Sequence, residues 1–255
     1  MITAIIQART NSTRLPQKIL LEVLEKTLLE LMIERIRNSK SLEKIVIATT
    51  VNSTDDVIED LCKKLQIECY RGSEDDVLSR YVMVGEKTKS DIIVRLNSDC
   101  PLIDPCIIDE VITFYLNNNY DYVSNVFPKF GSFPEGMGVE IFSYGLLKTI
   151  STKAKKPSQR EHPTSFIWTQ PTKFKIFRIE CKKNLKKYRL SLDYEEDFQL
   201  IKSVFDELYD RNQKFGLDEI IDWLDKNPKI FHLNSHITKD EGWLLSLEKD
   251  KSAGF

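Results

Sequence analysis

The chain has 255 residues, of which 41% are hydrophobic and 30% charged, an ordinary composition for a globular protein. Lysine and arginine number 37 against 39 aspartates and glutamates, and a net charge of −2 argues against nucleic acid as the main ligand. Five cysteines without a CxxC pair argue against a disulfide framework and a structural zinc site. With no signal-peptide pattern and no apolar run near the roughly 20 residues that span a bilayer, we expect a cytoplasmic protein that does not enter a membrane.

Strand-type and helix-type segments alternate through the first half of the chain. We expect strands at Ile2–Gln7, Lys44–Thr49, Ile67–Tyr70 and Asp91–Leu96. We expect helices at Ile19–Arg37, Asp55–Leu65 and Asp75–Glu86. Strands that alternate with helices predict an α/β fold with a mainly parallel sheet.

The pattern changes in the middle of the chain and becomes helical again near its end. We expect strands at Tyr120–Val126, Gly138–Phe142 and Phe174–Glu180, with a turn-rich stretch at Pro128–Gly138. We expect helices at Phe198–Tyr209 and Leu217–Lys226, the second stopped by Asn227-Pro228, and a polar tail that frays after about Lys239. The predicted division is an α/β domain over residues 1–200 and a helical extension over residues 201–255 that packs on it.

The loop after the first strand is the first candidate site. Arg9, Arg14 and Lys18 lie there among small polar residues, and the loop has no carboxylate. Ligands dock at the carboxyl ends of strands in open α/β sheets, and backbone N–H groups with cationic side chains suit a triphosphate. The alternative is a solvated basic loop. The glycines of a Walker A motif are absent.

Two carboxylates are candidate metal ligands. Asp99 follows the Asp91–Leu96 strand, where it could hold Mg²⁺ over phosphates or simply cap a turn before Pro101. Asp193 ends a short strand-like segment and is followed by acidic residues that suit the first turn of a helix. The purely structural interpretation of Asp193 is the stronger one unless the two aspartates meet in space.

Seven motifs in order now amount to a family resemblance. They are QARTNSTRLPQKIL, KIVIAT, YRGSEDDVLSRY, VRLNSDCPLID, GMGVEIF, REHPTSF and RLSLDYEEDF. Together they resemble the spore coat polysaccharide biosynthesis protein F family, which is similar to CMP-Kdo synthetase and acylneuraminate cytidylyltransferase. The resemblance covers residues 1 to about 200 and extends to PKIFHLNSH near the end. It implies a Rossmann-like nucleotidyltransferase fold of the GT-A type, with a mixed, mainly parallel sheet between helices.

The resemblance also implies roles for individual residues. Those that bind the nucleotide are Gln7, Ala8, Arg9, Ser12, Arg14, Lys18, Arg71, Gly72, Ser73, Asp76, Asn97 and Asp99, among which Arg14, Lys18 and Asp99 act in catalysis. Those that hold the acceptor are Glu140, Arg160, Glu161 and His162, and those that bind the metal are Asp99 and Asp193. We expect Arg80 and Tyr81 to pack or pair within a helix rather than to touch ligand.

Two departures from the family pattern stand out. Ser98 precedes the first metal aspartate where relatives usually have glycine, and its bulk could narrow the approach of the nucleotide. Gln17 takes a loop position where relatives often carry glycine. Neither change removes a ligand.

The predicted function is transfer of a nucleoside monophosphate from a nucleoside triphosphate, with CTP first by resemblance, to an acidic or phosphorylated sugar-like acceptor. Pyrophosphate leaves, Mg²⁺ is the cofactor, the product serves polysaccharide synthesis, and the protein is expected to be a homodimer. One alternative is a glycosyltransferase of the GT-A type, although Asn97 stands where its metal motif has a first aspartate. The other is a nucleotide-binding relative without turnover.

Overall fold

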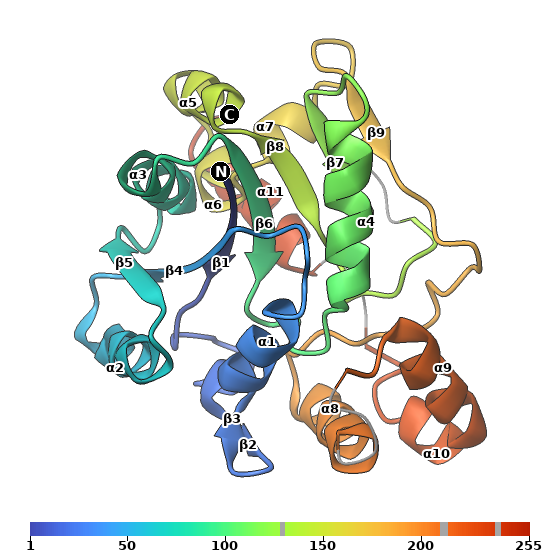
Figure 1. Ribbon diagram of the computed structural model, residues 1–255. Coiled ribbons are helices and arrows are strands. Elements are labelled where there is room, and N and C mark those ends of the chain that lie inside the picture. The colour runs from blue at the N-terminus through green and yellow to red at the C-terminus, as the bar shows by residue number, and fades with distance from the viewer. Residues whose placement is uncertain (128–130, 210–213, 238–240) are drawn as a thin grey trace.

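The computed structural model describes residues 1–127, 131–209, 214–237 and 241–255. Within these residues a seven-stranded sheet has the order β5-β4-β1-β6-β8-β7-β9 (Figure 1). The strands are β1 Ile2–Gln7, β4 Lys44–Thr50, β5 Glu68–Gly72, β6 Ile92–Asn97, β7 Tyr122–Ser124, β8 Glu140–Ser143 and β9 Ile176–Arg178. Strand β8 is antiparallel to both neighbours, and the other neighbouring pairs are parallel. The predicted mixed, mainly parallel sheet is confirmed.

Helices cover both faces of the sheet. One face packs against α1 Leu28–Ile36, α2 Asp56–Leu65 and α4 Pro105–Leu116, and the other against α3 Val77–Thr88, α5 Tyr144–Lys153 and α7 Ser165–Trp168. Alternate side chains of a strand point to opposite faces, so Ala4 and Ile6 enter the first core and Ile5 the second. Burial on both faces explains why these strands read as nearly continuous apolar runs.

The predicted helix Ile19–Arg37 is wrong in its first half. After a short 3-10 helix, η1 Lys18–Leu20, the chain forms a hairpin of β2 Glu22–Val23 and β3 Lys26–Thr27. The turn of this hairpin places Leu24 and Glu25 in the left-handed region, with φ of 54° and 59°. Helix α1 begins only at Leu28, and the hydroxyl of Thr27 caps it by accepting the N–H of Glu30.

Several elements of the structure were not predicted. Helix α4 begins after Asp104, whose carboxylate accepts the N–H of Cys106, and η2 Ser53–Asp55 precedes α2. Helices α5, α6 Pro157–Glu161 and α7 also lie where no helix was expected. Strands β7, β8 and β9 fall inside or near the predicted segments but are shorter. Of the turn-rich stretch Pro128–Gly138, residues 128–130 lie outside the described residues.

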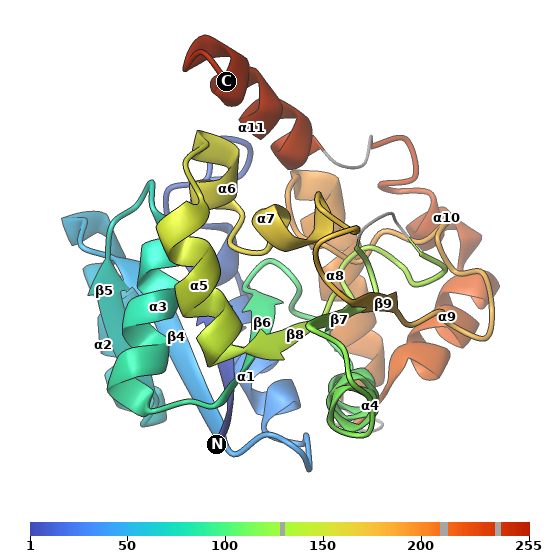
Figure 2. The same cartoon turned by 90° about the horizontal axis from the view of Figure 1, so that it is seen from above.

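The C-terminal part contains α8 Glu195–Leu208, α9 Leu217–Lys226, α10 Pro228–Phe231 and α11 Glu241–Ser252. Leu200 of α8 and Ile220 of α9 belong to the same buried cluster as Leu102 and Val111 of the sheet region. The expectation of a frayed tail is wrong, because α11 is a helix that packs on α6. Seen from above, α11 and α4 lie on opposite sides of the sheet (Figure 2). The boundary at residue 200 stays a prediction.

Candidate functional site

The loop between β1 and η1 is held in place by one buried carboxylate. Asp55 is 1% exposed and accepts both the N–H and the hydroxyl of Thr10, at 2.8 and 2.7 Å. The hydroxyls of Thr49 and Thr50 donate to its other oxygen. Burial raises the pKa of Asp55, but these hydrogen bonds outweigh it and leave the pKa below its ordinary value. An ionised Asp55 therefore fixes the start of the loop against the end of β4.

The end of the same loop is strained at Gln17. Its φ of 55° and ψ of 21° lie in the left-handed region, which glycine adopts without penalty. This conformation gives a physical reason for the glycine that relatives often carry there. The next residue, Lys18, is buried and directs its ammonium group to the carboxylates described below.

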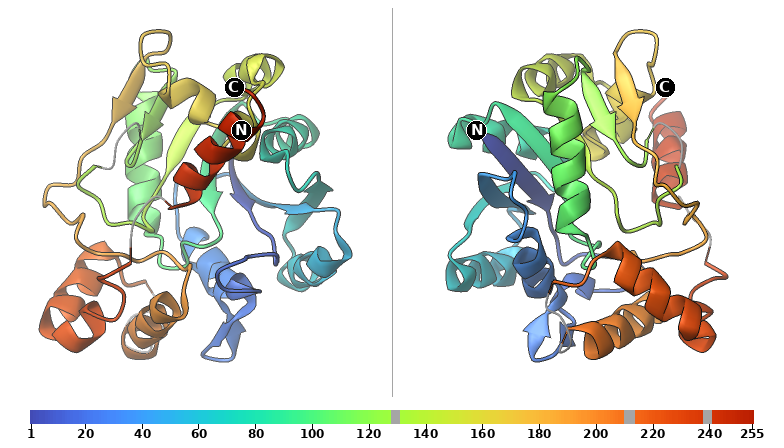
Figure 3. Two further views of the ribbon diagram at one scale, coloured as in Figure 1. Left: turned by 180° about the vertical axis from the view of Figure 1, so that it is seen from behind. Right: turned by 45° about the vertical axis from the view of Figure 1, so that its right-hand side comes forward.

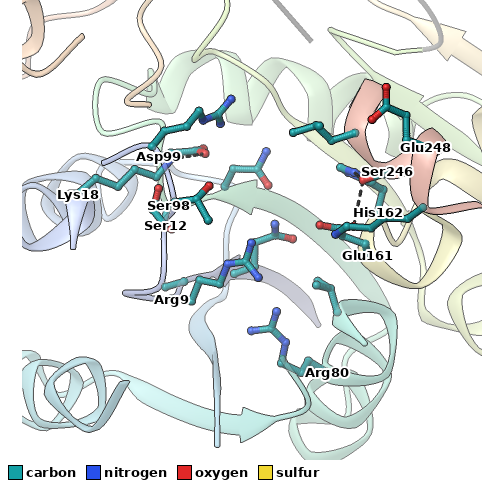
Figure 4. A pocket seen from close by; sticks show the side chains of 18 of the residues that line it. Arg9, Ser12, Lys18, Arg80, Ser98, Asp99, Glu161, His162, Ser246 and Glu248 are labelled. Atoms are coloured by element: carbon teal, nitrogen blue, oxygen red, sulfur yellow. Dashed lines mark hydrogen bonds and ion pairs between the residues drawn. The ribbon is translucent and has the colours of Figure 1, made fainter. Parts of the chain in front are cut away.

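Asp99 and Asp193 converge although they lie far apart in the chain. The N–H of Leu192 donates to the carbonyl oxygen of Asp99 at 2.8 Å and joins the two segments. The ammonium group of Lys18 then lies 3.1 Å from Oδ2 of Asp99 and 2.8 Å from Oδ1 of Asp193. Figure 4 shows Lys18 reaching toward Asp99 beside Ser12 and Ser98.

Asp193 is the more enclosed of the two carboxylates. Its side chain is 11% exposed, against 33% for Asp99. Arg14 reaches its Oδ1 at 2.5 Å and Arg189 its Oδ2 at 2.9 Å. Burial raises the pKa of Asp193, but Lys18, Arg14 and Arg189 together bring it below its ordinary value. Burial lowers the pKa of Lys18, but Asp99 and Asp193 raise it by more. The pKa of Lys18 therefore lies above its ordinary value.

Asp197 supports this arrangement from the first turn of α8. Its carboxylate accepts the N–H groups of Asp193 and Tyr194 at 2.9 and 3.0 Å, and it pairs with Arg189 at 2.9 Å. The acidic first turn expected from the sequence is therefore confirmed, and Asp197 caps the helix from within it. Arg189 was not predicted as a site residue. Its only signal in the sequence was a basic residue shortly before several acidic ones.

A cavity of about 990 Å³ is lined by Asp99, Arg14 and Lys18, but not by Asp193. Ten residues predicted to bind nucleotide or acceptor line it: Gln7, Ala8, Arg9, Ser12, Arg14, Lys18, Asn97, Asp99, Glu161 and His162. Gln7 and Asn97 are register partners at the carboxyl ends of β1 and β6, which places the cavity at the expected edge of the sheet. Ser98 also lines the cavity, as do Thr13, Val77 and Arg80.

Helix α11 forms a wall of the cavity that the sequence did not predict. The left panel of Figure 3 shows this C-terminal helix crossing the molecule near α6. Ser246 lies 2.9 Å from Nε2 of His162 and donates to Glu161 at 3.0 Å, and Lys249 pairs with Glu161 at 2.9 Å. Asp250 accepts the N–H and the hydroxyl of Ser158 at 2.8 and 2.6 Å. Two of the predicted acceptor residues, Glu161 and His162, thus lie under α11.

His162 is held in its neutral form. Burial is the main cause, and the nearby charge of Arg95 adds to it, so that the pKa of His162 falls to about 4. Trp243 of α11 packs its ring edge-on to the imidazole, with the ring centroids 5.4 Å apart. At neutral pH the imidazole of His162 can donate one hydrogen bond and accept another at this wall, but it carries no charge.

Four of the residues predicted to bind the nucleotide, Arg71, Gly72, Ser73 and Asp76, do not line the cavity. Arg71 lies on β5, where it pairs with Asp56 at 2.7 Å and Glu59 at 2.9 Å. The hydroxyl of Ser73 accepts the N–H of Asp76, and Asp76 caps α3 and pairs with Arg160. Gly72 lies beside the side chain of Arg80. Arg160, predicted to hold the acceptor, is thus joined to Asp76 rather than directed into the cavity.

Glu140 does not line the cavity either. It is 3% exposed, pairs with Arg95, and accepts the hydroxyls of Tyr122 and Thr164. Arg95 in turn donates to the side chain of Gln7 at 3.3 Å. These contacts give Glu140 a structural role within the sheet, where β8 lies between β6 and β7. Its role in holding the acceptor stays a prediction.

The two aspartates suit a hard divalent cation. Mg²⁺ in proteins is commonly bound by one or two carboxylates, with waters and substrate phosphates completing its shell. Asp99 and Asp193 already face one cation, the ammonium of Lys18, and the buried Oδ1 of nearby Asn97 has no hydrogen-bond partner among the described residues. No group of three or more His, Cys, Asp or Glu side chains in the described part of the chain forms a metal site. Bound phosphates would therefore have to supply further ligands.

Comparison with known proteins agrees with this geometry. The sequence model of the cytidylyltransferase family matches residues 3–224. The chain belongs to the cytidylyltransferase family. This member is 34% identical to spore coat polysaccharide biosynthesis protein SpsF of Bacillus subtilis, over 89% of this chain and 95% of SpsF. A solved cytidylyltransferase of Leptospira borgpetersenii superposes with a TM-score of 0.86 and 35% identity, covering 94% of this chain and 99% of that one.

A more distant structure shares only the fold with this cytidylyltransferase. CMP:2-keto-3-deoxy-manno-octonic acid synthetase, solved in complex with CTP, superposes with a TM-score of 0.63 at 15% identity, over 81% of this chain and 99% of that one. The expected resemblance to this group and the expected nucleotidyltransferase-type fold are therefore confirmed. The protein is an enzyme of the cytidylyltransferase family. None of the helices in the described ranges combines the length and apolar character needed to cross a membrane.

Proposed function

We propose that this enzyme transfers a cytidylyl group from CTP to an acidic or phosphorylated sugar-like acceptor in glycan precursor synthesis and releases pyrophosphate. The observation that carries the proposal is the meeting of Asp99 and Asp193 around Lys18, at a cavity lined by Arg9 and Arg14. A triphosphate with a divalent ion needs this combination of carboxylates and cations. The names of the relatives, among them a synthetase solved with CTP, support cytosine as the base.

In the proposed mechanism, an oxygen of the acceptor attacks the α-phosphorus of CTP in line. The new O–P bond forms while the bond from the α-phosphorus to the bridging oxygen breaks, and pyrophosphate carries away that electron pair. Arg9, Arg14 and Lys18 bind the phosphates and offset the charge that builds on the leaving group. An acceptor that presents an ionised oxygen needs no base from the protein.

We propose Mg²⁺ as the cofactor, held by Asp99 and Asp193. The ion would neutralise phosphate charge and favour ionisation of an attacking hydroxyl. For the carboxylates to receive it, the ammonium group of Lys18 has to move from its position between them toward the phosphates. Arg189 keeps Asp193 oriented during that exchange, because it contacts the other carboxylate oxygen at 2.9 Å.

We assign the acceptor to the part of the cavity between α6 and α11. Glu161 and neutral His162 offer hydrogen-bonding groups there, and Lys249 offers a positive charge close to Glu161. A cation beside hydroxyl-binding groups suits an acceptor with a carboxylate or phosphate and several hydroxyls. The acidic or phosphorylated acceptor predicted from the sequence is supported by this lining.

We further propose that the enzyme is a cytoplasmic homodimer. All five cysteines are free thiols, as a reducing compartment requires. Within the described residues, strand β9 is the last strand of the sheet and pairs with β7, so its other edge is available to a second copy. Sedimentation equilibrium measures the mass directly: twice the chain mass supports the dimer, and the mass of one chain contradicts it.

A nucleotide scan tests the proposed reaction. The four ribonucleoside triphosphates are compared by thermal shift with and without Mg²⁺, because stabilisation grows with ligand concentration over Kd. CTP with Mg²⁺ should give the largest shift, and an acidic sugar should then release pyrophosphate from it. Release of a free nucleoside diphosphate from a nucleotide-sugar, supplied in place of CTP, would indicate glycosyl transfer instead. The absence of any shift with CTP would contradict the proposal.

A further inference from the structure

One buried arginine has far fewer partners than its burial requires. Arg80 lies on α3 and is 2% exposed, yet it lines the cavity. Its Nη1 donates to the carbonyl oxygen of Ala48 at 3.1 Å, and its buried Nε has no hydrogen-bond partner in the described part of the chain. Among the described residues, no carboxylate lies within ion-pair distance of it. A buried guanidinium with one hydrogen bond and no carboxylate beside it is costly, which makes this residue unusual.

Arg35 shows how a structural arginine is satisfied in the same protein. It is equally buried, and it too contacts no carboxylate among the described residues. Its guanidinium donates to three backbone carbonyls, those of Ile103, Leu102 and Phe215, and stacks on the ring of Phe215 at 4.1 Å. Burial lowers the pKa of both arginines, that of Arg35 to about 10. Arg80 has one carbonyl where Arg35 has three, and it faces a cavity.

The surroundings of Arg80 suit a flat, partly apolar ligand group. A Cβ at Gly72 would lie 2.7 Å from Cγ of Arg80, so the glycine leaves room for the arginine side chain. Val77, one turn earlier on α3, and Ala8 at the end of β1 line the cavity and are nearly buried. Figure 4 shows Arg80 below Arg9 and apart from Lys18 and Asp99, where the phosphates and metal are proposed to bind.

We propose that Arg80 recognises the pyrimidine base of the bound nucleotide. This inference rests on the proposed function. The open edge of the guanidinium presents N–H donors, and cytosine offers two adjacent acceptors, O2 and N3. Uracil carries a hydrogen on N3, so the same edge would face one acceptor and one donor. Such a mismatch inside a buried site discriminates strongly, because it leaves polar groups unpaired.

The test compares Arg80→Met with Arg35→Met as the matched control. Calorimetry measures the affinities for CTP, UTP and inorganic triphosphate in the presence of Mg²⁺, and calorimetric scans give the Tm. Arg80→Met should weaken CTP binding by about 10- to 100-fold, bring the CTP/UTP ratio close to one, and leave inorganic triphosphate unaffected. Its Tm should equal or exceed that of the wild type, because a costly buried charge is gone.

The control and a second variant keep the outcomes distinct. Arg35→Met should lower Tm and leave the CTP/UTP ratio unchanged. Arg80→Lys keeps the positive charge but lacks the forked N–H donors of the guanidinium, so it should also lose the selectivity for CTP over UTP. An unchanged CTP/UTP ratio in both Arg80 variants overturns the inference, and so does an equal loss of inorganic triphosphate binding, which would assign Arg80 to the phosphates. If wild-type protein fails to bind CTP, the proposed function itself fails, and this inference with it.

Discussion

The N–H of Leu192 donates to the carbonyl oxygen of Asp99 at 2.8 Å. This hydrogen bond places the segment of Asp193 beside the end of β6, where Lys18 contacts both carboxylates and the carbonyl oxygen of Leu192. The arrangement is a small cluster of alternating charges, of which Lys18 and Asp99 line the cavity. Its energetic consequence is that Lys18 and Asp193 stay ionised, because the opposite charges around them offset the cost of burial.

The first prediction concerns Asp99. Asp99→Asn keeps the shape of the side chain and removes its charge, so it should lower the rate of pyrophosphate release from CTP by at least about 10²- to 10³-fold. The Tm should change little, because the side chain is one-third exposed. Asp60→Asn, an exposed change on α2, serves as the control and should leave the rate unchanged. Turnover near that of the wild type at saturating Mg²⁺ would refute the assignment of Asp99 to the metal.

The second prediction concerns Arg14. Arg14→Ala should reduce the rate of pyrophosphate release by about 10²- to 10³-fold, because a cation that offsets charge on the leaving group is lost. Asp193 retains Lys18 and Arg189, so the fold should be unaffected by circular dichroism. Arg37→Ala removes an exposed guanidinium that donates to the carbonyl of Leu65, and it should not alter the rate. Equal rates for the two variants would contradict a role for Arg14 at the phosphates.

The third prediction concerns the attachment of α11. Asp250→Ala removes the carboxylate that accepts two hydrogen bonds from Ser158 and leaves both buried donors unpaired. The backbone amides of α11 should then exchange with solvent faster, and the fluorescence of Trp243, which packs against Trp168, should change. Lys251→Ala on the same helix is the control. Unchanged exchange in Asp250→Ala would mean that α11 is held by other contacts.

The fourth prediction concerns pH. The pKa of His162 is lowered to about 4 in the folded protein, mainly by burial, whereas an unfolded histidine titrates near 6.5. Between these values the unfolded chain binds the proton that the folded protein refuses, so the free energy of unfolding should fall as pH drops from about 6.5 toward 4. Glu161 and Lys249 are the charged neighbours of the ring at this wall.

The variant His162→Gln isolates this contribution. Chemical denaturation at a series of pH values should give a shallower decline for His162→Gln than for the wild type between pH 6.5 and 4. Above pH 6.5 the two stability curves should run parallel. Identical slopes over the acidic range would show that His162 is protonated as easily in the folded state as in the unfolded state.

The sheet could be predicted from the sequence because its strands are buried on both faces. Ile2–Gln7 was placed at its observed bounds, and Lys44–Thr50 within one residue. The hairpin before α1 could not be predicted from the sequence. Its turn places Leu24 and Glu25 at positive φ, where the usual sequence signal is Asn-Gly. Helix α11 was missed because it is polar on most of its surface and is held by side-chain hydrogen bonds to α6.

The candidate site was predicted only in part, because a local sequence pattern places some of its residues and long-range contacts place the others. Residues at strand ends, such as Arg9 and Asp99, can be placed by the rule that ligands dock at the carboxyl edge of the sheet. The position of Asp193 beside them depends on a long-range backbone hydrogen bond that leaves no local pattern. Arg71 has the right residue type near the right strand, but Asp56 and Glu59 of the preceding helix already engage it. Packing decides which of several possible partners a side chain contacts, and a single sequence does not show how the chain packs.

A crystal structure of the protein with CTP and Mn²⁺ in place of Mg²⁺ tests the central claim most directly. The anomalous signal of manganese should appear between the carboxylates of Asp99 and Asp193, with the triphosphate along the loop of Arg9 and Arg14 and the ammonium of Lys18 moved onto a phosphate. A manganese ion bound elsewhere, with Lys18 still bridging the two aspartates while CTP is present, would contradict the account.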